Sequence, residues 1–481
     1  MPILKNKIFI YLVTCYLTYG LQFILSLIIA AKLGPFYLGV YGMVQLILSY
    51  FGQVNLGIPH SLNVFLVHNK DDNTIQDIYT LNSLTLYTYV NLTVFVGAII
   101  ADFCGFTKWG EYDLQLYFPM MIIITLGNYY NTIITTVIRF RNQVNVLSLI
   151  GTIPVLLNLT IIWFFSNEAL VVALIVANVI SCIITTIIGY AEKAFPKIDI
   201  SKIDMNIQKG IMKKGLYLFL YNSCFYFILI AIRSMIGGFY SVEEFGYFTF
   251  SYTIANAVML LLDSLNTIIF PKIIDLLSKD NQIEKILILN KLRVGYITTS
   301  HLLIYTAMLC FPFVIYIFPK YEMALKSMNM IALAILMNAN SYGYNTLLIA
   351  QNKEKISSKI SFVALLITLV VGMFLIKVIH VEFSFVIISV MVAYLFFSFL
   401  VTYEGHRIIE GCTSVKYTLK NFFPVRLLVP YFLALVISMN GIETIVWMPI
   451  IVFLLFNYKD INFLVGLVKK MIINPNIIDL K

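Results

Sequence analysis

Tyr130-Asn131-Thr132-Ile133-Ile134 returns later in the chain as Tyr344-Asn345-Thr346-Leu347-Leu348, and each copy ends an apolar stretch. A polar turn carrying cations follows both copies. Other landmarks recur at a similar spacing, namely 33–37 with 236–240, 38–41 with 245–248, and Pro59 with Pro271. Self-similarity of this kind predicts a chain built from two related halves. Since such halves in membrane proteins usually flank a substrate site, the pattern favours a transporter.

The composition restricts the protein class. Of 481 residues, 60% are hydrophobic and only 12% are charged, and the mean hydropathy is +0.89. A soluble protein of this length could not keep so much apolar surface from water, so we predict an all-α polytopic membrane protein.

Helical spans can be located because a helix needs about 20 apolar residues to cross a bilayer. We predict about 14 of them, at 8–30, 36–66, 78–101, 114–138, 144–165, 168–190, 215–238, 247–270, 294–318, 326–349, 356–376, 382–403, 422–439 and 442–458. The first is read as a retained span rather than a signal peptide, because its apolar region is too long.

The distribution of Lys and Arg predicts the orientation. With the N-terminus placed in the cytoplasm, 27 cations fall on the inner side and five on the outer side, and Arg233 lies inside a span. This bias follows the positive-inside rule and predicts that both termini are cytoplasmic. The net charge of +9 is then explained by topology, so no nucleic-acid partner is expected, and basic inner loops facing anionic lipid are the ordinary interpretation.

Six spans in each half predict parallel repeats around a central cavity, related by an axis along the membrane normal. The expected parts are an N-terminal half at 1–195, a basic cytoplasmic loop at 196–214, a C-terminal half at 215–410, and two additional helices with a cytoplasmic tail at 411–481. No loop is long enough for a folded soluble domain. The longest outer connection, around 102–113, has about a dozen residues.

Two ionisable residues inside spans are the first candidates for function, because a charge in the membrane costs about 2.5–3.5 kcal/mol on insertion scales. Arg233 could line the cavity and face an anionic substrate, or its long stem could reach the outer interface. Asp263 is too short to reach the interface from its depth, so we expect a role in the cavity. It could couple transport to H⁺ or Na⁺.

Weaker candidates lie nearer the membrane surfaces. His60 follows Pro59 in a polar patch where Gly57 and Pro59 predict a kink; it either bonds a neighbouring helix or titrates in the cavity. Lys32 lies at the predicted outer mouth. Four cations in matching inner turns either set the topology or attract a lipid phosphate: Arg139, Arg141, Lys353 and Lys355.

No motif for catalysis or cofactor binding is present. The chain has no Walker A loop. Its five histidines and six cysteines show neither metal-ligand spacing nor a disulfide framework. We therefore expect a protein that is not an enzyme and has no metal or organic cofactor.

Several segments resemble one family. The stretch 30–60 runs from Ala30-Ala31-Lys32-Leu33-Gly34 through Gly39-Val40-Tyr41 to Leu56-Gly57-Ile58-Pro59. Further support comes from Phe140-Arg141, Arg233 with Gly237, Phe245-Gly246-Tyr247, and Phe270-Pro271-Lys272. Together they resemble the O-antigen and capsule repeat-unit flippases, the polysaccharide branch of the multidrug/oligosaccharidyl-lipid/polysaccharide superfamily. Many members place an acidic residue just before the span-seven arginine, whereas Ile232 stands here.

The resemblance implies translocation of undecaprenyl-pyrophosphate-linked oligosaccharide from the inner to the outer leaflet of the bacterial cytoplasmic membrane. The implied partners are that lipid-linked oligosaccharide, membrane lipids and other polysaccharide-assembly membrane proteins. Three alternatives remain open: a multidrug exporter of the same superfamily, a surface-polysaccharide polymerase, and a scaffolding membrane protein.

Overall fold

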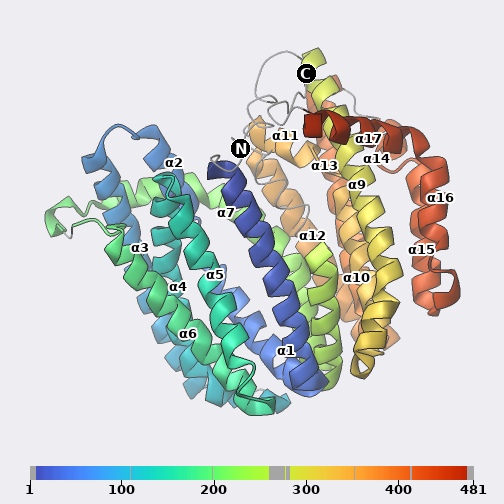
Figure 1. The fold of residues 1–481 in the computed structure, drawn as a ribbon. Helices are drawn as coiled ribbons and strands as arrows, with labels where there is room; N and C mark the ends of the chain where they lie inside the picture. Colours follow the sequence, from blue (N-terminus) through green and yellow to red (C-terminus); the bar gives the residue numbers. More distant parts are fainter. Residues whose placement is uncertain are drawn as a thin grey trace. The chain divides into compact units, whose positions relative to one another are not determined.

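The computed structural model describes residues 7–108, 110–197, 199–258, 277, 282–351, 353–411 and 414–473 (Figure 1). These residues form helices joined by short turns, and no strand occurs among them. Their contacts divide the chain into two compact units. Unit 1 contains Met1–Ser223 and Ser241–Gly246, and unit 2 contains Cys224–Tyr240 and Tyr247–Lys481.

The predicted helical membrane class is confirmed. Within the described residues, eight helices are long and apolar enough to cross a membrane, or up to ten when each of two bent pairs counts as one span. Two shorter apolar helices, Asn145–Ile161 and Ala324–Ala339, coincide with further predicted spans. The expected partition into two six-helix repeats stays a prediction.

Unit 1 begins with α1 (Lys7–Gly52), which merges the first predicted span with part of the second. Gly34, at φ 68, and Pro35 bend α1 where the prediction had a loop. The predicted kink near Pro59 is a true interruption, because Gly57 adopts φ 71 before the next helix begins. The remaining helices of this part are α2 (Ile58–His68), α3 (Asn73–Phe103), α4 (Leu114–Phe140), α5 (Val144–Ile161) and α6 (Asn167–Ala191).

The repeated motif contributes hydrogen bonds between helices in both units. In α4 the amide of Asn131 donates to the Cys182 carbonyl at 3.1 Å, and its oxygen accepts from the Thr186 hydroxyl at 3.0 Å. In unit 2 the equivalent Asn345 accepts from the Ser357 hydroxyl at 3.2 Å. The motif therefore has a packing role in each copy.

A pair of matching glycines makes a close contact inside unit 1. A Cβ on Gly39 would overlap the carbonyl oxygen of Val242, and a Cβ on Gly246 would overlap that of Pro35. The two contacts are equivalent: Gly39 contacts the residue four positions before Gly246, and Gly246 contacts the residue four positions before Gly39. Such reciprocity is what a local twofold axis produces.

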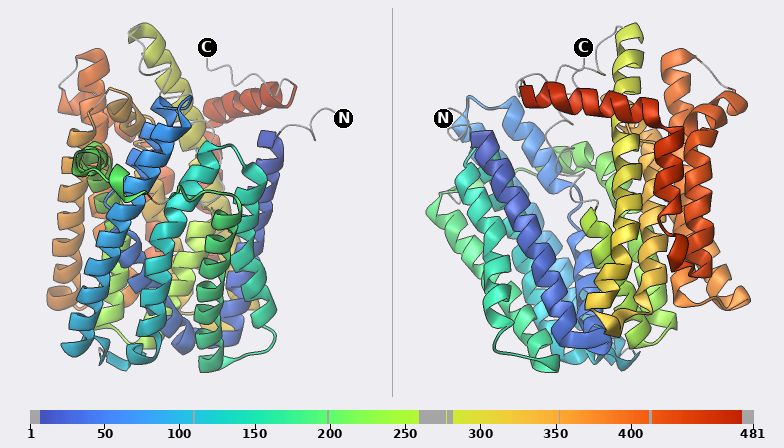
Figure 2. Two further views of the ribbon diagram at one scale, coloured as in Figure 1. Left: turned by 90° about the vertical axis from the view of Figure 1, so that its left-hand side faces the viewer. Right: turned by 45° about the vertical axis from the view of Figure 1, so that its right-hand side comes forward.

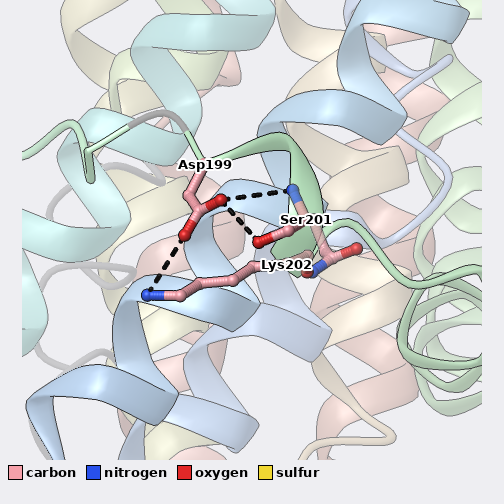
Figure 3. Close-up of polar contacts among 4 residues, drawn as sticks. Asp199, Ser201 and Lys202 are labelled. Carbon is pink, nitrogen blue, oxygen red and sulfur yellow. Dashed lines mark hydrogen bonds and ion pairs between the residues drawn. The ribbon is translucent and has the colours of Figure 1, made fainter.

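The connection after α6 is ordered against α3. The carboxylate of Asp199 accepts from the hydroxyl and amide of Ser201 at 2.6 and 3.2 Å, and lies 3.6 Å from the Lys202 ammonium (Figure 3). The buried Asn82 of α3 donates to the Lys202 carbonyl and accepts from the Asp204 amide. α7 (Met205–Phe239) then begins, so 205–214 is helix where a loop was expected.

A helix from 242, whose described part reaches 258, has its first residues in unit 1 and the rest in unit 2. Unit 2 continues with α9 (Gln282–Ile317) and α10 (Ala324–Ala339). A turn at 340–343 separates α10 from α11 (Tyr344–Ala350). The later helices are α12 (Glu354–Phe374), α13 (Ile388–Glu410), α14 (Val415–Phe422), α15 (Val425–Asn440), α16 (Met448–Phe456) and α17 (Tyr458–Ile473).

The expected cytoplasmic tail is helical as far as Ile473. α17 is bent by 78° from α16, and Figure 2 shows it turned across the direction of that helix. Asp460 in its first turn pairs with Arg426 of α15 at 2.6 Å. This ion pair ties the additional helices to one another within unit 2.

Candidate functional site

Arg233 lies in the part of α7 that belongs to unit 2, and only 7% of its surface is exposed. Its guanidinium carbon stands 4.8 Å from the centre of the Tyr252 ring. A cation held over an aromatic face is stabilised by the ring quadrupole. The described residues therefore enclose most of this side chain, and both interpretations of its role stay predictions.

Fewer structural details describe the two other candidates predicted inside spans, Asp263 and His60. Asp263 lies outside the described residues. His60 is exposed on α2 in unit 1. The roles of Arg233 and His60 stay predictions.

Lys32 has a structural contact in unit 1. Its ammonium donates to the carbonyl of Ile162 at 2.5 Å and lies 5.5 Å from the centre of the Trp163 ring. Ile162 is the residue that caps α5. A cation at a helix C-terminus is favourable because the last carbonyls have no partner within the helix.

The four turn cations lie where the repeat predicts them. Arg139 and Arg141 are at the α4–α5 turn, and Lys353 and Lys355 are at the α11–α12 turn. Arg141 donates to the carbonyls of Glu192 and Lys193 at the end of α6, at 3.2 and 2.9 Å. Arg139 and Lys355 are exposed, and Lys353 is half-buried.

A second buried arginine was missed by the sequence analysis. Arg293 of α9 is 7% exposed, and its guanidinium carbon stands 4.2 Å from the centre of the Tyr344 ring. The Tyr344 hydroxyl lies 2.6 Å from Nε2 of the buried His406 in α13. Gly405 allows this approach, because a Cβ there would overlap the Tyr344 ring.

Another buried histidine lies in the same unit. His301 of α9 has Nδ1 3.2 Å from the Tyr305 hydroxyl and Nε2 3.4 Å from Oδ1 of Asn340. Its ring stacks on Phe453 of α16 with centroids 5.1 Å apart. Within the described chain, no group of three or more His, Cys, Asp or Glu residues is placed to hold a metal ion.

Signals for these residues were present in the sequence. His301 falls inside a predicted span, and Arg293 precedes the same span by one residue. Tyr344 opens the second copy of the repeated motif. Metal-ligand spacing is not the only signal that a histidine can carry, because His301, like Arg233, is an ionisable residue inside a predicted span.

The buried charges of the described residues share one sign. They are Arg233, Lys285 and Arg293, and no buried carboxylate occurs in that part of the chain. All three lie in unit 2. This half of the protein thus offers cations, in a setting of low dielectric constant, to a ligand that carries negative charge.

No family profile and no curated protein matches the chain. Several solved structures match the chain. An inward-facing multidrug resistance MATE family transporter of the MOP superfamily is 14% identical, with 83% of this chain and 95% of that chain covered and a TM-score of 0.68. The lipid II flippase MurJ in an inward closed conformation is 13% identical, with 96% and 99% covered and a TM-score of 0.62.

A third match is a MOP superfamily transporter from Pyrococcus furiosus, which is 12% identical, with 84% and 95% covered and a TM-score of 0.51. These alignments cover nearly the whole length of each solved transporter. The chain is therefore a multi-pass membrane protein with the fold of the MOP superfamily transporters.

Proposed function

We propose that this protein is a flippase that moves undecaprenyl-pyrophosphate-linked oligosaccharide repeat units, of an O-antigen or capsule, from the inner to the outer leaflet. It acts in the bacterial cytoplasmic membrane with both termini in the cytoplasm. It works by alternating access and is not an enzyme. Its partners are the lipid-linked oligosaccharide, surrounding lipids and other polysaccharide-assembly membrane proteins.

One observation carries the proposal: every buried charge among the described residues is a cation. A pyrophosphate crossing the membrane must be neutralised, because an unpaired ion in low dielectric is strongly unfavourable. Guanidinium groups suit this role, since they remain charged and bond phosphate oxygens in pairs. Arg233 is our candidate for contacting the anion.

The sugar head group needs a polar path of its own. Each hydroxyl that loses water without gaining a partner costs several kcal/mol, so the oligosaccharide cannot cross hydrocarbon unaided. Two halves that rock about a central polar cavity would replace the lost water. Asp263 is our candidate for coupling this movement to H⁺ or Na⁺, or for orienting the cavity cations. No other cofactor is proposed.

A multidrug exporter is the second candidate, and the MATE family fold favours considering it. Cationic drugs call for acidic cavities, whereas the described buried charges are basic. A polymerase would be expected to carry a long outer region. Among the described residues, the predicted outer connection holds two short 3-10 helices, Phe106–Lys108 and Gly110–Tyr112.

The test is a strain from which the gene is deleted, assayed together for surface polysaccharide and for lipid-linked repeat units in each leaflet. We expect loss of surface glycan, with complete repeat units retained on the cytoplasmic leaflet. Complementation should restore the glycan with the wild-type gene and not with Arg233→Ala. Arg407→Ala is the matched control, since this arginine is more than half exposed and pairs with Glu404 at 3.2 Å.

Two other results would overturn the proposal. Unchanged glycan with altered sensitivity to cationic dyes would identify a drug exporter. Single repeat units that reach the outer leaflet without being joined would identify a polymerase.

A further inference from the structure

The turn between α10 and α11 occurs in only one copy of the repeated motif among the described residues. Gly343 precedes Tyr344 there with φ 88, a conformation that side chains with a Cβ rarely adopt. In unit 1 the equivalent position is Tyr129, which lies inside the unbroken α4. The second copy of the motif therefore follows a break in the helix that the first copy lacks.

Arg293 lies against this break. A Cβ on Gly343 would lie 3.4 Å from Cγ of Arg293 and 2.7 Å from a methyl carbon of Leu289, so the arginine stem passes beside the glycine. The guanidinium rests on the Tyr344 ring, and the hydroxyl of Tyr344 is hydrogen-bonded to His406. Nη1 of Arg293 is buried and has no hydrogen-bond acceptor.

A second buried donor borders the same break. Asn340 is fully buried, and its oxygen is engaged by His301, but its Nδ2 has no acceptor. A buried donor without a partner costs about 1–3 kcal/mol, and more when it is charged. Asn340 bonds His301, which follows Arg293 by eight residues, about 12 Å of helix, so the two donors lie at different depths. The charged donor, Arg293, is the one that most needs an oxygen acceptor.

Among the described residues, no side chain supplies the required acceptor. No ion pair joins Arg293 to a carboxylate within the described residues. Glu410, at the end of α13, is exposed and acts on Tyr344 and His406 only through its charge. No described carboxylate neutralises the positive charge of Arg293, so an anion from outside the chain can do so.

The depth of Arg293 indicates which anion. It precedes Ile317, the last residue of α9, by 24 residues, which is about 36 Å of helix. The hydrocarbon core is about 30 Å thick, so a helix that ends at the outer surface places Arg293 at the level of the inner phosphates. This placement of Arg293 depends on the proposed orientation of the protein in the membrane, but it does not depend on which lipid is transported.

We propose that Arg293 binds the phosphate group of a lipid at the inner leaflet. The source is either a phospholipid headgroup or a polyprenyl pyrophosphate, and both offer the same oxygens. The planar guanidinium donates to two phosphate oxygens. Tyr344 and His406 are positioning residues, because they fix the ring on which the guanidinium rests.

The experiment measures the thermal midpoint and lipid affinity of the full-length protein in detergent. The probes are phosphatidylglycerol, undecaprenyl pyrophosphate, inorganic phosphate and diacylglycerol, the last having acyl chains but no phosphate. The variants are Arg293→Gln and Arg293→Lys. Arg407→Gln is the control, since it removes a more exposed, paired cation from the same end of unit 2.

We expect the phosphate lipids, and not diacylglycerol, to raise the midpoint of the wild type. Arg293→Gln should weaken that binding at least about tenfold, while its midpoint without lipid is unchanged or higher, because an unpaired donor has been removed. A structural arginine predicts the reverse: a lower midpoint without lipid and an unchanged affinity, which would overturn the inference. So would equal binding of diacylglycerol.

The two lipids distinguish the sources. Preference for undecaprenyl pyrophosphate means that the site receives the transported lipid, and preference for phosphatidylglycerol means that it holds a membrane lipid. Either supports the phosphate site, and binding of phosphatidylglycerol alone is compatible with failure of the proposed function. If Arg293→Gln does not fold, Arg293→Lys tests the same site, because it keeps the charge but loses the planar pairing, and an unchanged affinity for both phosphate lipids overturns the inference.

Discussion

Arg233 and Arg293 illustrate one rule at the scale of a residue. Each guanidinium is buried in unit 2 and lies over a tyrosine ring, Tyr252 for Arg233 and Tyr344 for Arg293. A ring recovers part of the lost solvation but supplies no hydrogen-bond acceptor. Nη1 of Arg293, which has no hydrogen-bond acceptor, therefore remains able to bind an anion.

We predict that Arg233→Ala lowers transport at least about tenfold, because the loss of a charged contact to phosphate is worth about 1.5–3 kcal/mol. Arg233→Lys should retain part of the activity, since the charge remains but the planar pairing is lost. Surface glycan per unit of membrane-inserted protein is the measurement. Activity equal to wild type in Arg233→Ala would rule out contact with the anion.

Asn131 gives a prediction about stability rather than transport. Asn131→Ala removes its bonds to the Cys182 carbonyl and the Thr186 hydroxyl, so the free energy of unfolding should fall. Bonds between membrane helices average about 0.6 kcal/mol each. The thermal midpoint in detergent should therefore drop by a few degrees. Asn128→Ala, an exposed position on the same helix, should leave it unchanged.

At the scale of an element, the reciprocal glycine contact in unit 1 is a packing requirement. Gly246→Ala forces the new methyl group against the Pro35 carbonyl, and such overpacking costs about 1–3 kcal/mol. Gly39→Ala should behave alike, because the contact is reciprocal. At Gly20 a Cβ meets nothing within 4 Å, so Gly20→Ala should be neutral or stabilising. Equal midpoints for all three variants would contradict this packing.

The connection after α6 gives a prediction about pH. The hydrogen bonds from Ser201, above all from its hydroxyl, and the nearby Lys202 ammonium lower the pKa of the Asp199 carboxyl below 3.8. Because the folded pKa is the lower one, this carboxylate stabilises the segment above the ordinary value. That stabilisation is lost as the pH falls through the folded value.

A nitroxide label at Ile200, an exposed position, reports the order of this segment. We expect constant label mobility from pH 8 to about 5 and a rise below the ordinary carboxyl pKa of about 3.9. Asp199→Ala should show the mobile signal at neutral pH. A label at the equally exposed Tyr190, the residue before the end of α6, is the control and should respond to neither change.

At the scale of the whole molecule, the orientation can be tested with a natural cysteine. Cys104 caps α3, is exposed, and lies in the connection predicted to be outside. In a variant retaining only Cys104, a membrane-impermeant maleimide should label intact cells. In a variant whose one cysteine comes from Asp71→Cys, in the turn after α2, labelling should require permeabilised cells. The opposite pattern would invert the topology.

The helical class and the positions of most helices follow from the sequence alone, for a physical reason. Hydrocarbon accepts backbone only when its polar groups are paired within the segment, so a run of about 20 apolar residues must be a helix. The repeat, the turn cations and the interruption at Gly57 are equally local. They were all readable from the chain.

Features that depend on contacts between distant helices could not be predicted from the sequence. The break at Gly343 and the burial of Arg293 result from how α9, α11 and α13 pack, and Tyr130 of the same motif instead lies 3.1 Å from the Thr88 hydroxyl in unit 1. Lys32, expected at a cavity mouth, is engaged by the end of α5. Apolar length specifies a helix because lipid is a uniform solvent, whereas the partner of a buried charge is specified by neighbours that only tertiary packing brings together.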